Sequence, residues 1–145
     1  MIQEAYVSFE TAKLLREKGF DEPCNQCYAK HPKEDKPKLM FNDAGTNSKG
    51  VYGAVFPFLA SAPSQQMAMR WLREVHNIVI CAEIGNENDK GNTDYTNPDR
   101  WHWFFDLTNE KGVVIEPESD YILNEFDSYE DAVEAAIQYC LTNLI

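Results

Sequence analysis

Apolar side chains recur at the three- and four-residue spacing of an amphipathic helix in three stretches of the chain. The first stretch follows Ser8, a typical N-cap residue, and stops at Gly19, which suits the position just past a helix end. The second begins near Pro63, a favoured first helical residue, and stops at Asn77, which adopts a left-handed conformation readily. Its apolar residues are Met67, Met69, Trp71, Leu72 and Val75.

The third stretch begins at Ser128 and has the most regular apolar pattern in the chain. Ser128 with Asp131 forms a variant of the capping box, so we expect a helix to start there. The apolar residues repeat at helical spacing, which predicts one buried face. They are Ala132, Val133, Ala136, Ile137, Cys140, Leu141 and Leu144.

Short apolar and aromatic runs between the helices predict β-strands. Ile78–Ile84 is expected to form a buried strand and Arg100–Leu107 an aromatic strand. Turn residues then precede Val113–Glu116, which predicts the returning partner of a hairpin. Val51–Leu59 also has strand-like composition, but Pro57 should confine it to a sheet edge or end it early.

Two polar segments, Cys24–Gly50 and Gly85–Asp99, are expected to be long connections, of which the first carries one short edge strand at Leu39–Phe41. Strands that follow one another through short turns pair antiparallel, and amphipathic helices need a sheet face to cover. We therefore expect a single α+β domain over residues 1–145. Its three amphipathic helices should pack on a mostly antiparallel sheet.

The net charge of −11, from 24 acidic and 13 basic residues, argues against binding to nucleic acid, which needs clustered Lys and Arg. From Gly112 to Ile145 the chain has eight acids and no Lys or Arg. A solvated surface would explain this cluster of acids. The alternative is an inhibitor surface whose carboxylates imitate nucleic acid phosphates and so bind a basic host protein. These acids are Glu116, Glu118, Asp120, Glu125, Asp127, Glu130, Asp131 and Glu134.

The apolar runs are too short to cross a bilayer, so no membrane partner is expected. The first residues lack the basic and apolar regions of a signal peptide. The sequence therefore predicts a cytoplasmic protein, in which the four cysteines stay reduced.

Cys24 and Cys27 form a CxxC pair, and His31 follows four residues later. A pair of thiolates at this spacing suits tetrahedral zinc, because a tight turn brings both sulfurs to one ion. A closed structural site also needs a fourth ligand, and the sequence has no second CxxC or His pair nearby. A small zinc-supported domain is therefore one hypothesis, but the pattern favours incidental cysteines and no cofactor.

The aromatic run RWHWFFDL is the strongest candidate for a binding surface. Along a strand, Trp101 and Trp103 share one face, while His102 lies on the other. If one face of the sheet is uncovered, these three residues would present an aromatic or imidazole group to a ligand or partner. The competing interpretation, which the composition favours, is that they pack in the core.

No nucleophile elbow, phosphate-binding Gly-rich loop or helix-turn-helix spacing is found in the sequence. The pattern therefore favours a noncatalytic protein over an enzyme.

Three segments, Tyr6–Cys24, Ser61–Ile80 and Tyr129–Ile145, resemble a family of small uncharacterised proteins of gut Bacteroidales and their phages or mobile elements. The resemblance covers somewhat under half of the chain, in the helices and their flanks. It implies a phage-related origin and no particular activity. The expectation is thus a binding or interaction module with a protein partner or a second copy of itself.

Overall fold

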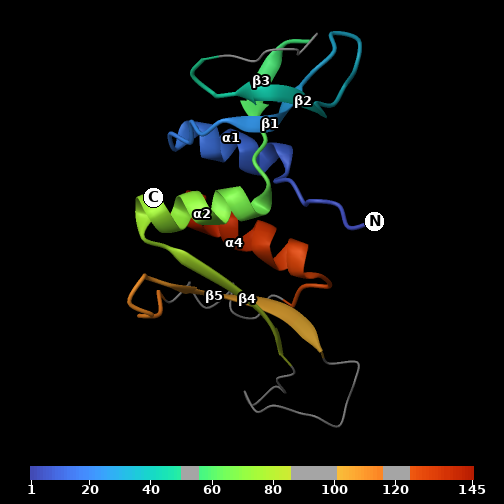
Figure 1. The fold of residues 1–145 in the computed structure, drawn as a ribbon. Coiled ribbons are helices and arrows are strands. Elements are labelled where there is room, and N and C mark those ends of the chain that lie inside the picture. Colours follow the sequence, from blue (N-terminus) through green and yellow to red (C-terminus); the bar gives the residue numbers. More distant parts are fainter. Residues whose placement is uncertain (50–55, 86–100, 116–124) are drawn as a thin grey trace.

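A layer of helices lies between two small antiparallel sheets in the computed structural model (Figure 1). The structure describes residues 1–49, 56–85, 101–115 and 125–145. Within these residues the predicted α+β class is confirmed, with three helices in a single compact body. The strands divide into a three-stranded and a two-stranded sheet, so the helices pack between sheets where the sequence suggested one sheet.

Helix α1 spans Phe9–Glu17 and has the predicted ends. The hydroxyl of Ser8 accepts the backbone N–H of Thr11, which satisfies one of the free donors of the first turn. After the helix, Gly19 has a φ of 91°, a left-handed conformation that glycine adopts without a side-chain clash. The chain then turns inward, and Phe20 is buried.

The upper sheet contains β1 (Cys24–Ala29), β2 (Lys38–Gly45) and β3 (Phe58–Ser61), in the order β2-β1-β3. The prediction that residues 24–50 form a long connection with one short strand is therefore wrong, because β1 and β2 pair as a hairpin. The register shifts between Cys24 and Gln26, so the alternation of buried and exposed residues is interrupted and does not show in the sequence.

The lower sheet consists of β4 (Val79–Gly85) paired with β5 (His102–Thr108). The predicted hairpin partner of the aromatic strand is reduced to an isolated bridge between Val114 and Thr108, and residue 116 lies outside the described residues. Of the strand predicted at Val51–Leu59, residues 51–55 also lie outside, and β3 begins at residue 58.

Helices α2 (Gln65–His76) and α4 (Tyr129–Asn143) complete the middle layer. Asn77 ends α2 with a φ of 57°, as predicted, and the Ser128 hydroxyl caps α4 by accepting the N–H of Asp131. In the described ranges, no helix is long and apolar enough to cross a membrane. The core joins all three helices to both sheets; its largest side chains with under 2 % exposure include Phe20, Leu15, Leu72, Leu107, Ile137 and Leu141.

Candidate interaction surfaces

The three aromatic-strand residues predicted to form a binding surface lie in different environments. Trp103 is half-buried and packs edge-to-face on Tyr129, with ring centroids 5.5 Å apart. Its backbone N–H and C=O both pair with Phe126, which holds the tryptophan against the start of α4. Trp103 therefore belongs mainly to the packing between β5 and α4.

His102 points to the opposite face of β5, away from the helices. Its Nε2 lies 3.4 Å from a carboxylate oxygen of Glu125, an ion pair when the imidazole is protonated. Trp101 precedes the strand and is 41 % exposed. The structure thus does not gather Trp101, His102 and Trp103 on one face.

Cys24 and Cys27 lie within β1, and both side chains are buried. Burial raises the pKa of the Cys24 thiol to about 12, with a smaller contribution from Glu22, and burial also raises the pKa of Cys27. His31 follows the strand and packs edge-to-face on Phe56 at 4.7 Å. Among the described residues, no three His, Cys, Asp or Glu side chains are placed to hold a metal ion.

The acids of the C-terminal segment do not all face solvent. Residues 116–120, which contain three of them, lie outside the described residues. Of the others, Glu134 is directed inward: its Oε1 accepts the backbone N–H of Ser8 at 2.9 Å and the hydroxyl of Thr11 at 2.5 Å. Glu130 and Asp131 are exposed in the first turn of α4. A surface that imitates nucleic acid would therefore lack Glu134.

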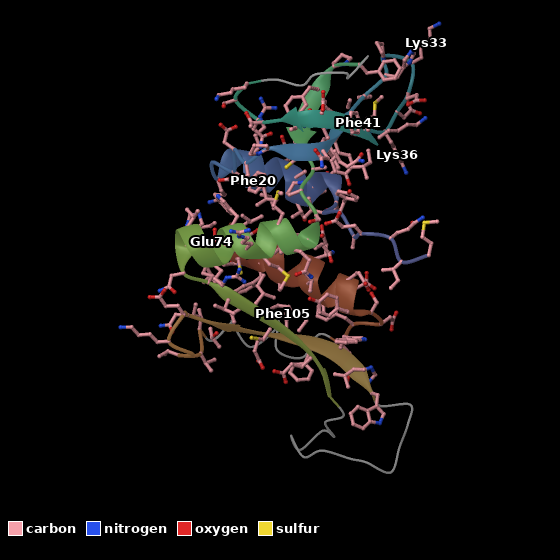
Figure 2. All side chains as sticks on the ribbon, viewed as in Figure 1. Phe20, Lys33, Lys36, Phe41, Glu74 and Phe105 are labelled. Carbon is pink, nitrogen blue, oxygen red and sulfur yellow. The ribbon has the colours of Figure 1, made fainter. Side chains whose placement is uncertain are left out.

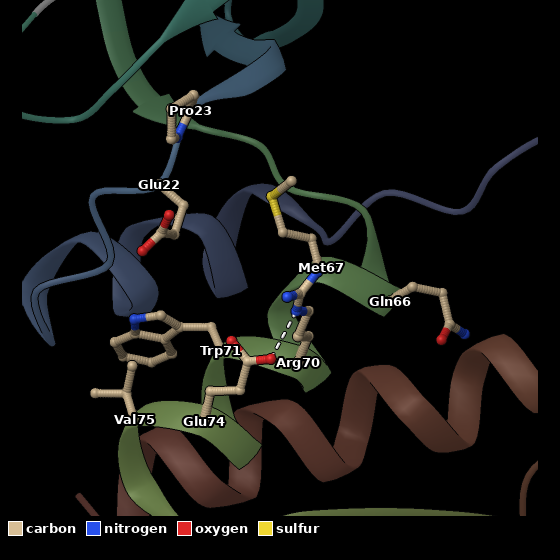
Figure 3. A pocket seen from close by; sticks show the side chains of 8 residues that line it. All are labelled: Glu22, Pro23, Gln66, Met67, Arg70, Trp71, Glu74 and Val75. Carbon is tan, nitrogen blue, oxygen red and sulfur yellow. Dashed lines mark hydrogen bonds and ion pairs between the residues drawn. The ribbon is translucent and has the colours of Figure 1, made fainter.

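A cleft of about 610 Å³ lies between α2 and the loop that joins α1 to β1 (Figure 3). This volume is within the usual range for a binding pocket. One wall of the cleft is a single face of α2, because residues three, four, seven and eight positions apart share one helix face. The lining residues are Glu22 and Pro23 from the loop, and Gln66, Met67, Arg70, Trp71, Glu74 and Val75 from α2.

The cleft exposes apolar side chains beside carboxylates. Met67 is 37 % exposed and Val75 is 58 % exposed, whereas Trp71 is 7 % exposed. Arg70 is paired with Glu74, its Nε 2.8 Å from the carboxylate oxygen. Glu22 has no ion pair with another described residue.

Neighbouring contacts hold the apolar part of the cleft in place. The Trp71 ring packs edge-to-face on Phe20 at 5.6 Å and on His76 at 4.6 Å. The sulfur of Met67 lies 3.9 Å from the Cys24 thiol. These contacts preorganise the cleft, which lowers the entropic cost of binding.

The sequence pattern does not reveal this cleft, because Met67, Trp71 and Val75 all belong to the apolar stripe that predicts the helix. The signal was the width of that stripe, since five apolar residues in nine positions extend beyond one helix face. No family model, curated protein or solved structure matches this chain. We therefore infer its function from its own geometry.

Proposed function

We propose that this protein is a noncatalytic interaction module that binds a basic partner protein through the α2 cleft. One observation carries the proposal: Met67 and Val75 are exposed on the same helix face, in a cleft that the nearly buried Trp71 also lines. Buried aromatic side chains surrounded by apolar and polar groups are typical of the energetic centre of a protein interface.

The charges of the cleft favour a basic partner. The lining contains Glu22 and Glu74 against one cation, Arg70, which already pairs with Glu74. The whole chain carries a charge of −11, which attracts basic proteins at long range. The expected ligand is a peptide segment with an apolar residue next to a Lys or Arg. The cationic group of that Lys or Arg would lie near Glu22.

Two observations support a noncatalytic role. The three histidines lie apart, with Phe56, Trp71 and Glu125 as their respective neighbours. The thiols have pKa values raised by burial, which keeps them protonated and poorly nucleophilic at neutral pH. Turnover of a compound from a broad substrate panel by the purified protein would contradict this part of the proposal.

We also propose a cytoplasmic location and a phage or mobile-element origin. All four cysteines are free, which suits a reducing compartment. The origin is supported by the resemblance of the three helical segments to proteins of gut Bacteroidales and their phages.

The test uses peptides selected from a random display library on the immobilised wild-type protein. Selection should enrich peptides with an apolar residue next to Lys or Arg. Replacing Met67 and Val75 together by Asp should weaken their binding at least tenfold, and higher salt should weaken it as well. Val113→Asp is the matched control, because Val113 is 59 % exposed and is not one of the residues that line the cleft.

Glu22→Gln separates charge from packing. It should reduce the affinity for the selected basic peptides and leave the stability of the protein unchanged, because Glu22 is exposed. Selected peptides that bind the Met67→Asp, Val75→Asp double variant as tightly as the wild type would overturn the proposed site.

A further inference from the structure

The outer edge of β2 is a second surface with unusual properties. Among the described residues, β2 pairs only with β1, so its other edge, the open edge, has no described strand beside it. The N–H of Ala62 bonds to the carbonyl of Gln26, and the N–H of Lys30 bonds to Pro57. Gln26 and Lys30 therefore direct their backbone groups toward the β3 side.

Because backbone groups alternate in direction along a strand, Cys27 and Ala29 direct theirs toward β2. Their register partners Met40 and Lys38 must direct their own groups back toward β1. The N–H and C=O groups of the alternate residues Leu39 and Phe41 consequently point to the open edge.

Leu39 and Phe41 also present exposed side chains, at 41 % and 61 % exposure. Both side chains lie on one face of the strand, and Lys38 and Met40 lie on the other. The same two residues thus combine outward-directed backbone groups with accessible apolar surface. Open edges of this kind are templates for an added strand, which binds through main-chain hydrogen bonds and gains specificity from alternate side chains.

Charge distinguishes this edge from the remainder of the protein. Residues 30–43 contain four lysines against three acids, whereas the rest of the chain has 9 basic residues against 21 acids. Figure 2 shows Lys33 and Lys36 at the same end of the molecule as Phe41. Lys38 pairs with Glu34, but no described carboxylate pairs with Lys33 or Lys36.

We propose that the β2 edge accepts an extended segment of an acidic partner protein as an added strand. The segment would place apolar side chains beside Leu39 and Phe41, and acidic side chains toward Lys33 and Lys36. A second copy of the chain is disfavoured, because it would bring the same lysine-rich edge. The site is separate from the α2 cleft, so either proposal can fail without the other.

The probes are three synthetic heptapeptides: one alternating glutamate and valine, one alternating lysine and valine, and the glutamate peptide with a central proline. Backbone amide resonances of the protein are followed by NMR during titration. The glutamate peptide should shift the amides of Leu39 and Phe41 and slow their hydrogen exchange. The lysine and proline peptides should bind at least tenfold more weakly, because one reverses the charge and the other removes a main-chain donor.

Variants locate the contact. Leu39→Thr and Phe41→Thr together keep β-strand propensity while removing the apolar surface, and should abolish binding of the glutamate peptide. Met67→Asp with Val75→Asp should leave that binding unchanged, since they lie in the cleft.

Three outcomes would overturn the proposal. The first is an absence of shifts at Leu39 and Phe41 with millimolar glutamate peptide. The second is equal binding of the lysine peptide. The third is a dimer in sedimentation experiments that the Leu39→Thr, Phe41→Thr variant abolishes, because this would assign the edge to a second copy.

Discussion

Glu134 in α4 accepts the backbone N–H of Ser8, the N-cap residue of α1, with its Oε1 2.9 Å from the nitrogen. In a capping box, a Glu or Gln within the first turn of the same helix takes this bond. Here that position is occupied by Thr11, and the carboxylate comes from a helix more than 120 residues later. Oε2 also accepts from the Gln65 amide at 3.3 Å, so one side chain ties together α1, α2 and α4.

Glu134→Ala should therefore be strongly destabilising. It removes the acceptor of three donors, of which one belongs to the N-cap residue of α1 and one to its first turn. Hydrogen bonds to charged groups contribute more than neutral ones. We expect the free energy of unfolding to fall by about 2–3 kcal/mol in urea denaturation. Glu130→Ala is the control, because Glu130 is an exposed side chain of the same helix and should change stability little. Equal effects of both substitutions would contradict the role of Glu134 in linking the three helices.

Leu107 should be a sensitive position of the lower core. Its side chain is fully buried between β5 and the helices, so Leu107→Ala leaves a cavity. We expect a loss of about 2–5 kcal/mol in the free energy of unfolding. Val113→Ala truncates an apolar side chain that is 59 % exposed and should change stability by under about 0.5 kcal/mol. A small effect at Leu107 would mean that the lower sheet does not pack on the helices as described.

Gly85 and Phe104 should be coupled. A Cβ at Gly85 would lie 2.5 Å from Cε1 of Phe104, so Gly85→Ala forces the ring to move. We expect a cost of about 1–3 kcal/mol in the wild-type background and less in a Phe104→Ala background. A double-mutant cycle by chemical denaturation measures the difference. Additive effects would show that the ring does not cover Gly85 in solution.

Stability should decrease at alkaline pH because of the buried thiols. Burial raises the pKa of Cys24 and of Cys140 to about 12, whereas an unfolded thiol titrates near about 8.5. The unfolded chain thus loses these protons first, so the stability they contribute is complete below pH 8.5 and decreases until the folded pKa is reached.

The measurement compares the wild type with a Cys24→Ala, Cys140→Ala variant in denaturation at pH 7 and pH 10. The stability difference between them should shrink by about 2 kcal/mol per thiol at the higher pH. Cys81→Ala is the control, since Cys81 is only half-buried, and its effect should depend less on pH. A stability difference that is the same at both pH values would show that the two thiols are not protected in the folded state.

The sequence by itself determined most ends of the described helices, but α2 begins at Gln65 after the N-cap Ser64, and Pro63 precedes the helix where it was expected to be the first helical residue. Ser8, Asn77 and Ser128 end or begin helices where their side chains and backbone preferences predict, because capping involves only residues a few positions apart. The strand that follows α2 was also predictable from its apolar run, but the expected full burial was wrong, because Ile84 at the far end of β4 is 53 % exposed. These features depend on local chemistry, which the order of residues contains directly.

The tertiary structure alone decided which surfaces are open. The hairpin of β1 and β2 was hidden by a register shift near Cys24, and the exposure of Phe41 depends on β2 being an edge strand. Likewise, Met67 and Val75 resemble core residues in the sequence, and only the packing of α2 against α4 and β4 leaves them outside. Partner choice between distant segments determines burial, and no local pattern records that choice.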